Sequence, residues 1–99
     1  MTSQSRLATP DELESAFQTE LATDKWAAAE TSYALALLLR DSGQWDRSRV
    51  WVKQCLELLE GLPTDSLDQV APRRHTVGGI PLPNYLHEGV VRDRFGELA

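Results

Sequence analysis

The sequence predicts an all-α fold, in which an antiparallel helical hairpin packs beside an N-terminal amphipathic helix and is followed by an extended C-terminal arm. Three observations predict it: a helix-start signature near residue 10, two apolar stripes on either side of a glycine turn, and frequent glycine and proline after residue 70. We therefore expect a disordered segment at 1–8, one helical domain at 9–70 with its hairpin at 25–60, and the arm at 71–99.

The N-terminal helix has a clear predicted start. Thr9 supplies a capping hydroxyl, Pro10 suits the first helical turn, and Glu12 occupies the third helical position of a capping box. Apolar residues then recur at spacings of three and four up to Leu21. We expect this helix to break near Asp24, although the absence of Gly and Pro there leaves a continuous long helix as the alternative.

The hairpin consists of two predicted helices joined by a tight turn. The first covers about residues 25–40 and carries a wide apolar stripe, which indicates contacts on two sides. Gly43 can adopt the left-handed conformation that ends this helix. The second begins at Trp45 or Asp46 and continues to residue 60, where Gly61 and Pro63 follow in the order expected at a helix end.

Small side chains recur at Ala36, Ser48 and Cys55, where the two hairpin helices should cross. They allow close packing, since a bulky residue there would hold the helix axes apart. With Gly43 and Trp45 at the turn, residues 26–63 resemble a single diverged tetratricopeptide repeat. The other matching positions are Leu35, Val52 and Leu56. Pro63 comes three residues later than the proline of the pattern, and Ser32 and Leu39 depart from it. The resemblance implies hairpin geometry and binding of a peptide or protein, although one repeat provides little groove.

The charge distribution bears on the class of partner. Residues 1–70 carry 12 acidic and 6 basic side chains, so the body of the protein is acidic and should repel nucleic acid. No apolar run is long enough to span a membrane, and the first ten residues lack the pattern of an export signal. The single cysteine, Cys55, is simplest to explain in a reducing compartment. These features predict a cytoplasmic protein that binds neither nucleic acid nor membrane.

The arm changes character at residues 77–83, which contain two glycines, two prolines and three large aliphatic residues. This composition predicts an extended, partly polyproline-like path. One interpretation is that the segment wraps back over the hairpin and completes its core; the other is that it reaches into a partner or a second copy of the chain. A final helix is expected at 85–95, weakened by Gly89 in its middle.

The candidate partner-binding residues are chosen by residue type and position. Aromatic and arginine side chains are enriched at protein interfaces. The tryptophan at position 51 lies between Val50 and Val52, and these three side chains cannot all face the same side of a helix. The predicted set is Trp51, Ile80, Leu82, Tyr85, Arg92, Arg94 and Phe95. The leading hypothesis is a non-catalytic protein-interaction module, an adaptor or assembly subunit, that self-associates through its hairpin and contacts a protein partner through its arm.

Two alternative functions remain open. The first is a regulatory small-ligand-binding domain with a pocket between hairpin and arm, lined by Trp26, Tyr33, Trp45 and Leu82. The second is a small enzyme that uses His75 or His87, although nothing in the sequence brings either histidine to a nucleophile and a carboxylate.

No cofactor or metal site is predicted. Gly78 and Gly79 lack the Lys-Ser/Thr that completes a phosphate-binding loop, and the histidines lack the spacing of a zinc site. Cys55 lies on an apolar stripe, where its thiol should have a raised pKa and be inert. Arg73, Arg74 and His75 are expected to form a solvated loop, with contact to an acidic partner or phosphate as the alternative.

Overall fold

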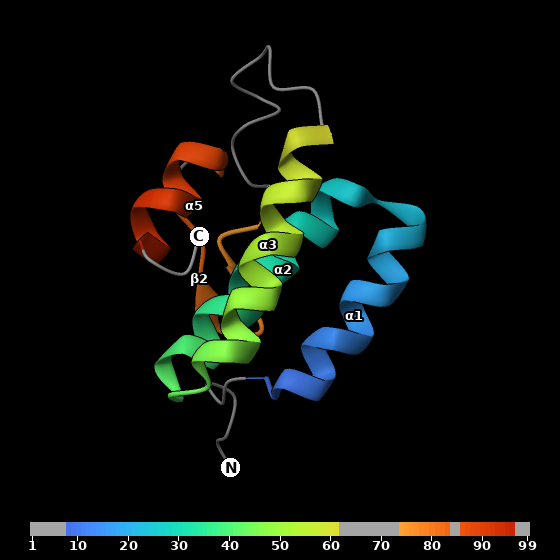
Figure 1. Cartoon of the computed structure of the whole chain (residues 1–99). Coiled ribbons are helices and arrows are strands. Elements are labelled where there is room, and N and C mark those ends of the chain that lie inside the picture. Colours follow the sequence, from blue (N-terminus) through green and yellow to red (C-terminus); the bar gives the residue numbers. More distant parts are fainter. Residues whose placement is uncertain (1–7, 62–73, 84–85, 97–99) are drawn as a thin grey trace.

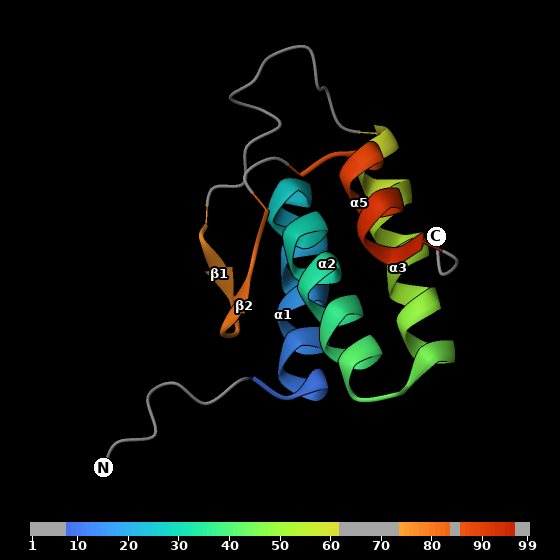
Figure 2. The ribbon, with the colours of Figure 1, turned by 90° about the vertical axis from the view of Figure 1, so that its left-hand side faces the viewer.

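Helix α2 (Lys25–Asp41) lies at the centre of the molecule, between the helices α1 (Pro10–Thr23) and α3 (Trp45–Gly61) that precede and follow it (Figure 1). The computed structural model describes residues 8–61, 74–83 and 86–96. The short helix α5 (Glu88–Phe95) packs against α3, and a two-stranded antiparallel sheet of β1 (Thr76–Val77) and β2 (Ile80–Pro81) packs against α2 (Figure 2). The predicted all-α fold class is confirmed. The predicted disorder at 1–8 concerns residues that, except for Ala8, lie outside the described ranges.

Helix α1 begins with the predicted capping box. The Thr9 hydroxyl accepts a hydrogen bond from the Glu12 backbone N–H at 3.2 Å, and the Glu12 carboxylate accepts one from the Thr9 N–H at 2.8 Å. At the other end, Asp24 has extended backbone with φ −154°, and its carboxylate accepts from the Ala27 N–H at 3.3 Å. The predicted break near Asp24 is confirmed, and the continuous helix is wrong.

Helices α2 and α3 cross closely because the residues at their contact are small. Ala36, Ser48 and Cys55 are fully buried. The Ser48 hydroxyl donates to the carbonyl oxygen of Ala36 at 2.7 Å, and the Cys55 thiol donates to that of Ala29 at 3.5 Å. Bonds from side chain to backbone across a helix pair require this close approach. The likeness to a tetratricopeptide repeat stays a prediction.

The segment expected to be polyproline-like instead folds into a β-hairpin. Thr76 pairs with Pro81 and Val77 with Ile80. Both turn residues have positive φ, +59° at Gly78 and +85° at Gly79, as a two-residue turn between right-twisted strands requires. The Gly-Gly pair at the turn was therefore the signal for a hairpin.

Helix α5 is shorter than predicted. His87 is its N-cap, and the Nδ1 atom of the imidazole accepts a hydrogen bond from the Gly89 N–H at 3.1 Å. The helix therefore starts at Glu88, which moves Gly89 from the expected helix middle to the first turn, where a glycine is easily tolerated. Residues 84 and 85, at the expected start, lie outside the described ranges.

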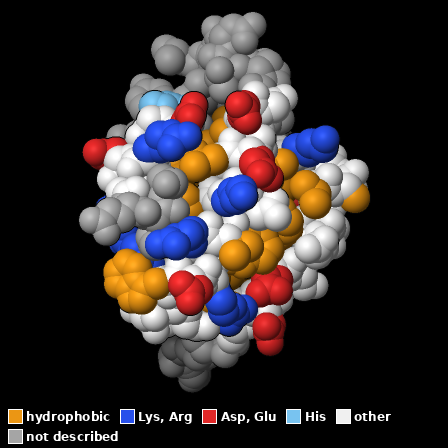
Figure 3. All heavy atoms as spheres, in the orientation of Figure 1, with side chains coloured by type: hydrophobic (Ala, Val, Ile, Leu, Met, Phe, Trp, Pro, Cys, Tyr) orange, Lys and Arg blue, Asp and Glu red, His pale blue; other side chains and the backbone are white. Residues whose placement is uncertain are grey.

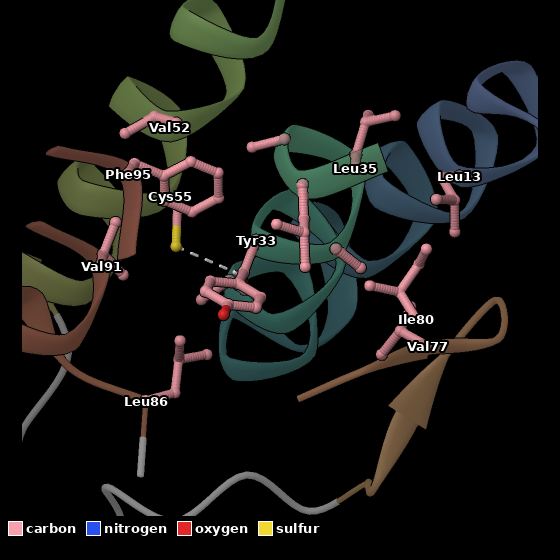
Figure 4. Close-up of a cluster of buried hydrophobic side chains, with 14 of the residues drawn as sticks. Leu13, Tyr33, Leu35, Val52, Cys55, Val77, Ile80, Leu86, Val91 and Phe95 are labelled. Carbon is pink, nitrogen blue, oxygen red and sulfur yellow. Dashed lines mark hydrogen bonds between the residues drawn. The ribbon is translucent and has the colours of Figure 1, made fainter. Parts of the chain in front are cut away.

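The described part of the arm completes the core of its own hairpin. Figure 4 shows Leu86, Val91 and Phe95 meeting Tyr33 on one side of α2, and Val77 and Ile80 meeting Leu13 on the other. These side chains are all buried. Two interpretations of the arm were open. For residues 74–83 and 86–96, the structure agrees with the one in which the arm packs back over the helical hairpin.

A polar cluster connects Arg74, which lies just before strand β1, to helices α1 and α2. The Arg74 Nε atom donates to the carboxylate of Glu30 at 2.8 Å, although the Glu30 side chain is only 1% exposed. The Arg74 Nη2 atom donates to the carbonyl oxygen of Ala27 at 2.9 Å, and Nη1 lies 3.4 Å from the Glu20 carboxylate. The expectation that Arg74 is part of a solvated loop is wrong, because a buried carboxylate needs a cationic partner.

Candidate functional site

A cavity of about 370 Å³ lies where the end of α2, the β-hairpin and α5 meet. Helix α2 contributes residues of its last turn, the β-hairpin contributes its turn and strand β2, and α5 contributes one arginine. The lining residues are Leu37, Arg40, Asp41, Gly79, Ile80, Pro81, Leu82, Pro83 and Arg94. We call this cavity the arm pocket, because most of its lining comes from the C-terminal arm.

Arg40 is held in place at one side of the arm pocket. Its Nη1 atom donates to the backbone carbonyl oxygen of Arg94 at 2.9 Å, and its Nη2 atom lies 3.5 Å from the Asp41 carboxylate. The guanidinium carbon also lies 5.4 Å from the centroid of the Phe95 ring, within the range of a cation–π interaction. These contacts fix the charge of Arg40 between α2 and α5.

Arg94 is anchored through one edge of its guanidinium and open at the other. Its Nε atom donates to the Tyr33 hydroxyl at 3.3 Å, a bond that raises the pKa of Arg94 above its ordinary value. Tyr33 itself is buried, with its ring packed edge-on against Phe95 at 5.5 Å. Arg94 is exposed, and within the described ranges its Nη1 and Nη2 atoms make no hydrogen bond, so this pair of donors is available to a ligand.

The remaining wall of the arm pocket is apolar. Leu37 and Ile80 are buried beneath it, and Leu82 is partly exposed. Pro81 and Pro83 contribute no backbone N–H to the wall. The site therefore combines an aliphatic surface with two arginines and one carboxylate, an arrangement that suits binding of an apolar group bearing a negative charge.

The structure brings together three of the seven predicted partner-binding residues. Ile80, Leu82 and Arg94 line the arm pocket, and Phe95 lies directly behind it against Arg40 and Tyr33. Sequence reasoning missed Arg40. Its signal was its place in the last turn of the helix at 25–40, where a basic side chain is favoured and remains near the surface.

The other predicted residues lie elsewhere. Trp51 packs edge-on against Phe17 of α1, with ring centroids 4.9 Å apart, so its second contact surface is the N-terminal helix. Arg92 forms an exposed ion pair with Glu88, one helical turn away on α5, at 2.9 Å. Tyr85 lies outside the described ranges.

Helix α3 belongs to the helical hairpin that is predicted to self-associate, and it carries two exposed hydrophobic residues that are not among the predicted partner-binding residues. Trp45 and Val50 are 56% and 55% exposed, the large hydrophobic side chains left most open among the described residues. In Figure 3, hydrophobic side chains on this side of the molecule lie among lysine, arginine and carboxylate groups. The available signal was the position of Val50, which falls opposite the buried residues Val52 and Cys55 on the helix.

Two of the three side chains considered for catalysis, those of Cys55 and His87, occupy structural positions. Burial raises the pKa of the Cys55 thiol to about 12, so this thiol is no nucleophile near neutral pH. The His87 side chain caps α5, whereas the His75 side chain is exposed. Within the described ranges, no three His, Cys, Asp or Glu side chains are placed to share a metal ion.

The four residues predicted to line a small-ligand pocket do not meet at the arm pocket. Only Leu82 lines the arm pocket. Trp26 and Tyr33 are buried in the core, and Trp45 is exposed at the start of α3. A pocket between hairpin and arm does exist, but it is built from aliphatic and arginine side chains rather than aromatic ones.

Comparison with known proteins identifies no relative, since no family model, curated protein or solved structure matches the chain. Among the described helices, none has both the length and the apolar composition needed to cross a bilayer.

Proposed function

We propose that this protein is a non-catalytic interaction module, an adaptor or accessory subunit of a larger complex, and that the arm pocket contacts its protein partner. The observation that supports the proposal is the convergence of Ile80, Leu82 and Arg94 on one pocket with Arg40. An aliphatic patch with arginine at its margin has the composition of an interface anchor site. The buried, protonated thiol of Cys55 is compatible with the cytoplasm, where we place the protein.

Site-specific cross-linking tests this proposal. A photoreactive amino acid at Pro83, which lines the arm pocket, should give a discrete cross-linked protein in the native cell, identifiable by mass spectrometry. The matched control places the same group at Gln18, an exposed position on α1. The Arg94→Gln change should remove the Pro83 product. Identical products from both positions would overturn the proposal.

The size of the arm pocket favours one second candidate, a regulatory small-ligand-binding domain. A volume of about 370 Å³ falls at the low end of ligand pockets, roughly 300–1,000 Å³. For this candidate, a metabolite should cause saturable changes in the amide NMR signals of Gly79 and Leu82 in the isolated protein. An adaptor with a protein partner should show no such response to free metabolites.

We further propose that the protein self-associates through the exposed face of α3. Arg49 and Lys53 lie in the middle of this helix, and Glu57 and Glu60 lie near its end, all exposed. Two copies of α3 packed antiparallel would place the basic residues of one opposite the acidic residues of the other. Such pairing would also cover Val50, which supports a second copy of the chain as the occupant of this face.

A further inference from the structure

We propose that the arm pocket recognises a single carboxylate beside an aliphatic side chain, as presented by an acidic residue next to Leu, Ile or Val in a segment of the partner protein. This inference rests on the proposed function and specifies the chemistry of the partner. It is carried by three features of the pocket: the open edge of one guanidinium, the net charge of the lining, and the apolar wall.

The open edge of Arg94 gives the site its preference for a carboxylate. The hydrogen bond from Nε to the buried Tyr33 hydroxyl fixes the plane of the guanidinium, while Nη1 and Nη2 have no partner within the described ranges. Two parallel N–H groups in one plane match the two oxygens of a carboxylate. Because Tyr33 already orients the arginine, less side-chain freedom is lost when the ligand binds.

The charge of the pocket selects a ligand with one negative charge. Its lining carries two arginines and one carboxylate, Asp41, so the net charge of the lining is +1. One carboxylate of the ligand offsets this charge, whereas the second negative charge of a phosphate would have no positive charge to offset it. A carboxylate bound at the outer edge of Arg94 would be attracted by this arginine and by Arg40, and the balance favours a monoanion.

The apolar wall specifies what stands beside the carboxylate. Leu37, Ile80 and Leu82 offer aliphatic surface. Pro81 and Pro83 have no backbone N–H to donate. A β-strand of the partner could therefore not accept backbone hydrogen bonds at these two positions. Recognition then depends on side chains. A neighbouring aliphatic residue of the partner can cover Leu82 while its acidic residue reaches Arg94.

The test is an NMR titration of the full chain with two short peptides that differ in one group. Acetyl-Leu-Glu-amide should shift the amide signals of Gly79 and Leu82 saturably, and acetyl-Leu-Gln-amide should bind about tenfold more weakly, because it lacks the charge-assisted pair. Arg94→Gln should cause a similar loss. Arg94→Lys keeps the positive charge but lacks the two parallel N–H donors, so it should also weaken binding. This second variant keeps the test informative if Arg94→Gln does not fold.

The matched control is Arg92→Gln, since Arg92 lies on the same helix but pairs with Glu88 and does not line the pocket. This variant should bind the Glu peptide as the parent does. Equal shifts with both peptides, or binding unaffected by Arg94→Gln, would overturn the inference. Binding of free phenylacetate but of neither peptide would also overturn it and would favour the small-ligand candidate.

The failure of this inference is distinguishable from failure of the proposed function. A discrete partner cross-linked at Pro83, together with no response to the Glu peptide, would refute carboxylate recognition and leave the interaction module standing. If the cross-linked partner is captured, the peptide that covers its contact site should contain an acidic residue beside an aliphatic one. A contact site without an acidic residue would count against the inference.

Discussion

At the scale of single residues, Cys55 shows how packing decides chemistry. The thiol is fully buried between α2 and α3 and donates to the carbonyl oxygen of Ala29. Desolvation raises its pKa from 9.0 to about 12, opposed in part by a hydrogen bond with Ser32. We predict that the native protein does not react with a thiol reagent at pH 8, and that reaction becomes fast in denaturant. A rapid native reaction would show that the thiol is exposed.

The same thiol makes stability depend on pH. Between pH 9 and pH 12 the unfolded chain loses the proton that the folded chain keeps, so the contribution of Cys55 to stability is complete below pH 9 and declines above it. Between pH 8 and pH 10, the unfolding free energy should fall by about 1 kcal/mol more in the parent than in Cys55→Ala. Denaturant titrations at both pH values measure the difference. Parallel declines would contradict the prediction.

The ion pair of Arg74 with Glu30 should be sensitive to mutation, because its carboxylate is buried. Arg74→Met keeps the length of the side chain but withdraws a guanidinium from a carboxylate that is 1% exposed. We expect a loss of about 2 kcal/mol, less than for a fully buried pair because Arg74 is itself partly exposed. The control Arg47→Met breaks an exposed pair with Glu14 and should cost less than about 1 kcal/mol. Similar losses in both variants, measured by urea unfolding, would be the contrary result.

At the scale of elements, local signals predicted the helices better than the arm. The capping residues at Thr9 and Asp24 and the glycine at position 43 determine helix ends through bonds and conformations within a few residues, so the sequence reveals them. The β-hairpin was missed because prolines at positions 81 and 83 outweighed the turn glycines in the interpretation. Pro81 is tolerated in β2 because a two-stranded sheet leaves one edge of each strand unpaired.

The β-hairpin turn provides a test at this scale. Gly78 has φ +59°, and an added Cβ would lie 2.8 Å from the Cβ of Ala8 and 3.0 Å from Cδ2 of Leu13. Gly78→Ala should therefore destabilise the protein by about 2 kcal/mol, through left-handed backbone strain and displacement of Ala8. Gly61→Ala, at a position with open space and ordinary backbone, is the control and should change stability by less than about 1 kcal/mol. Equal thermal midpoints for the two variants would argue against this turn.

At the scale of the whole molecule, the arm is part of the domain. The described residues of the arm supply five buried side chains, from Val77, Ile80, Leu86, Val91 and Phe95, so truncation before residue 74 should weaken the core as well as remove the arm pocket. Ile80, Leu82 and Arg94 could be selected from the sequence by residue type, but their convergence with Arg40 could not be predicted. Bringing Arg40 to Arg94 depends on contacts 54 positions apart, which no local pattern records. A periodic stripe likewise shows that a face is apolar without showing which segment covers it.

Among the described residues, the exposed face of α3 leaves the large hydrophobic side chain of Val50 uncovered. Light scattering over a concentration series should show a dimer in equilibrium with monomer, because Val50 and the self-complementary charges of α3 need a second copy to be covered. Val50→Glu should shift the protein to monomer, since it places a charge in the contact. The control Gln18→Glu, on the exposed side of α1, should leave the mass unchanged. A monomer at every concentration would remove self-association and leave the arm pocket as the proposed contact site.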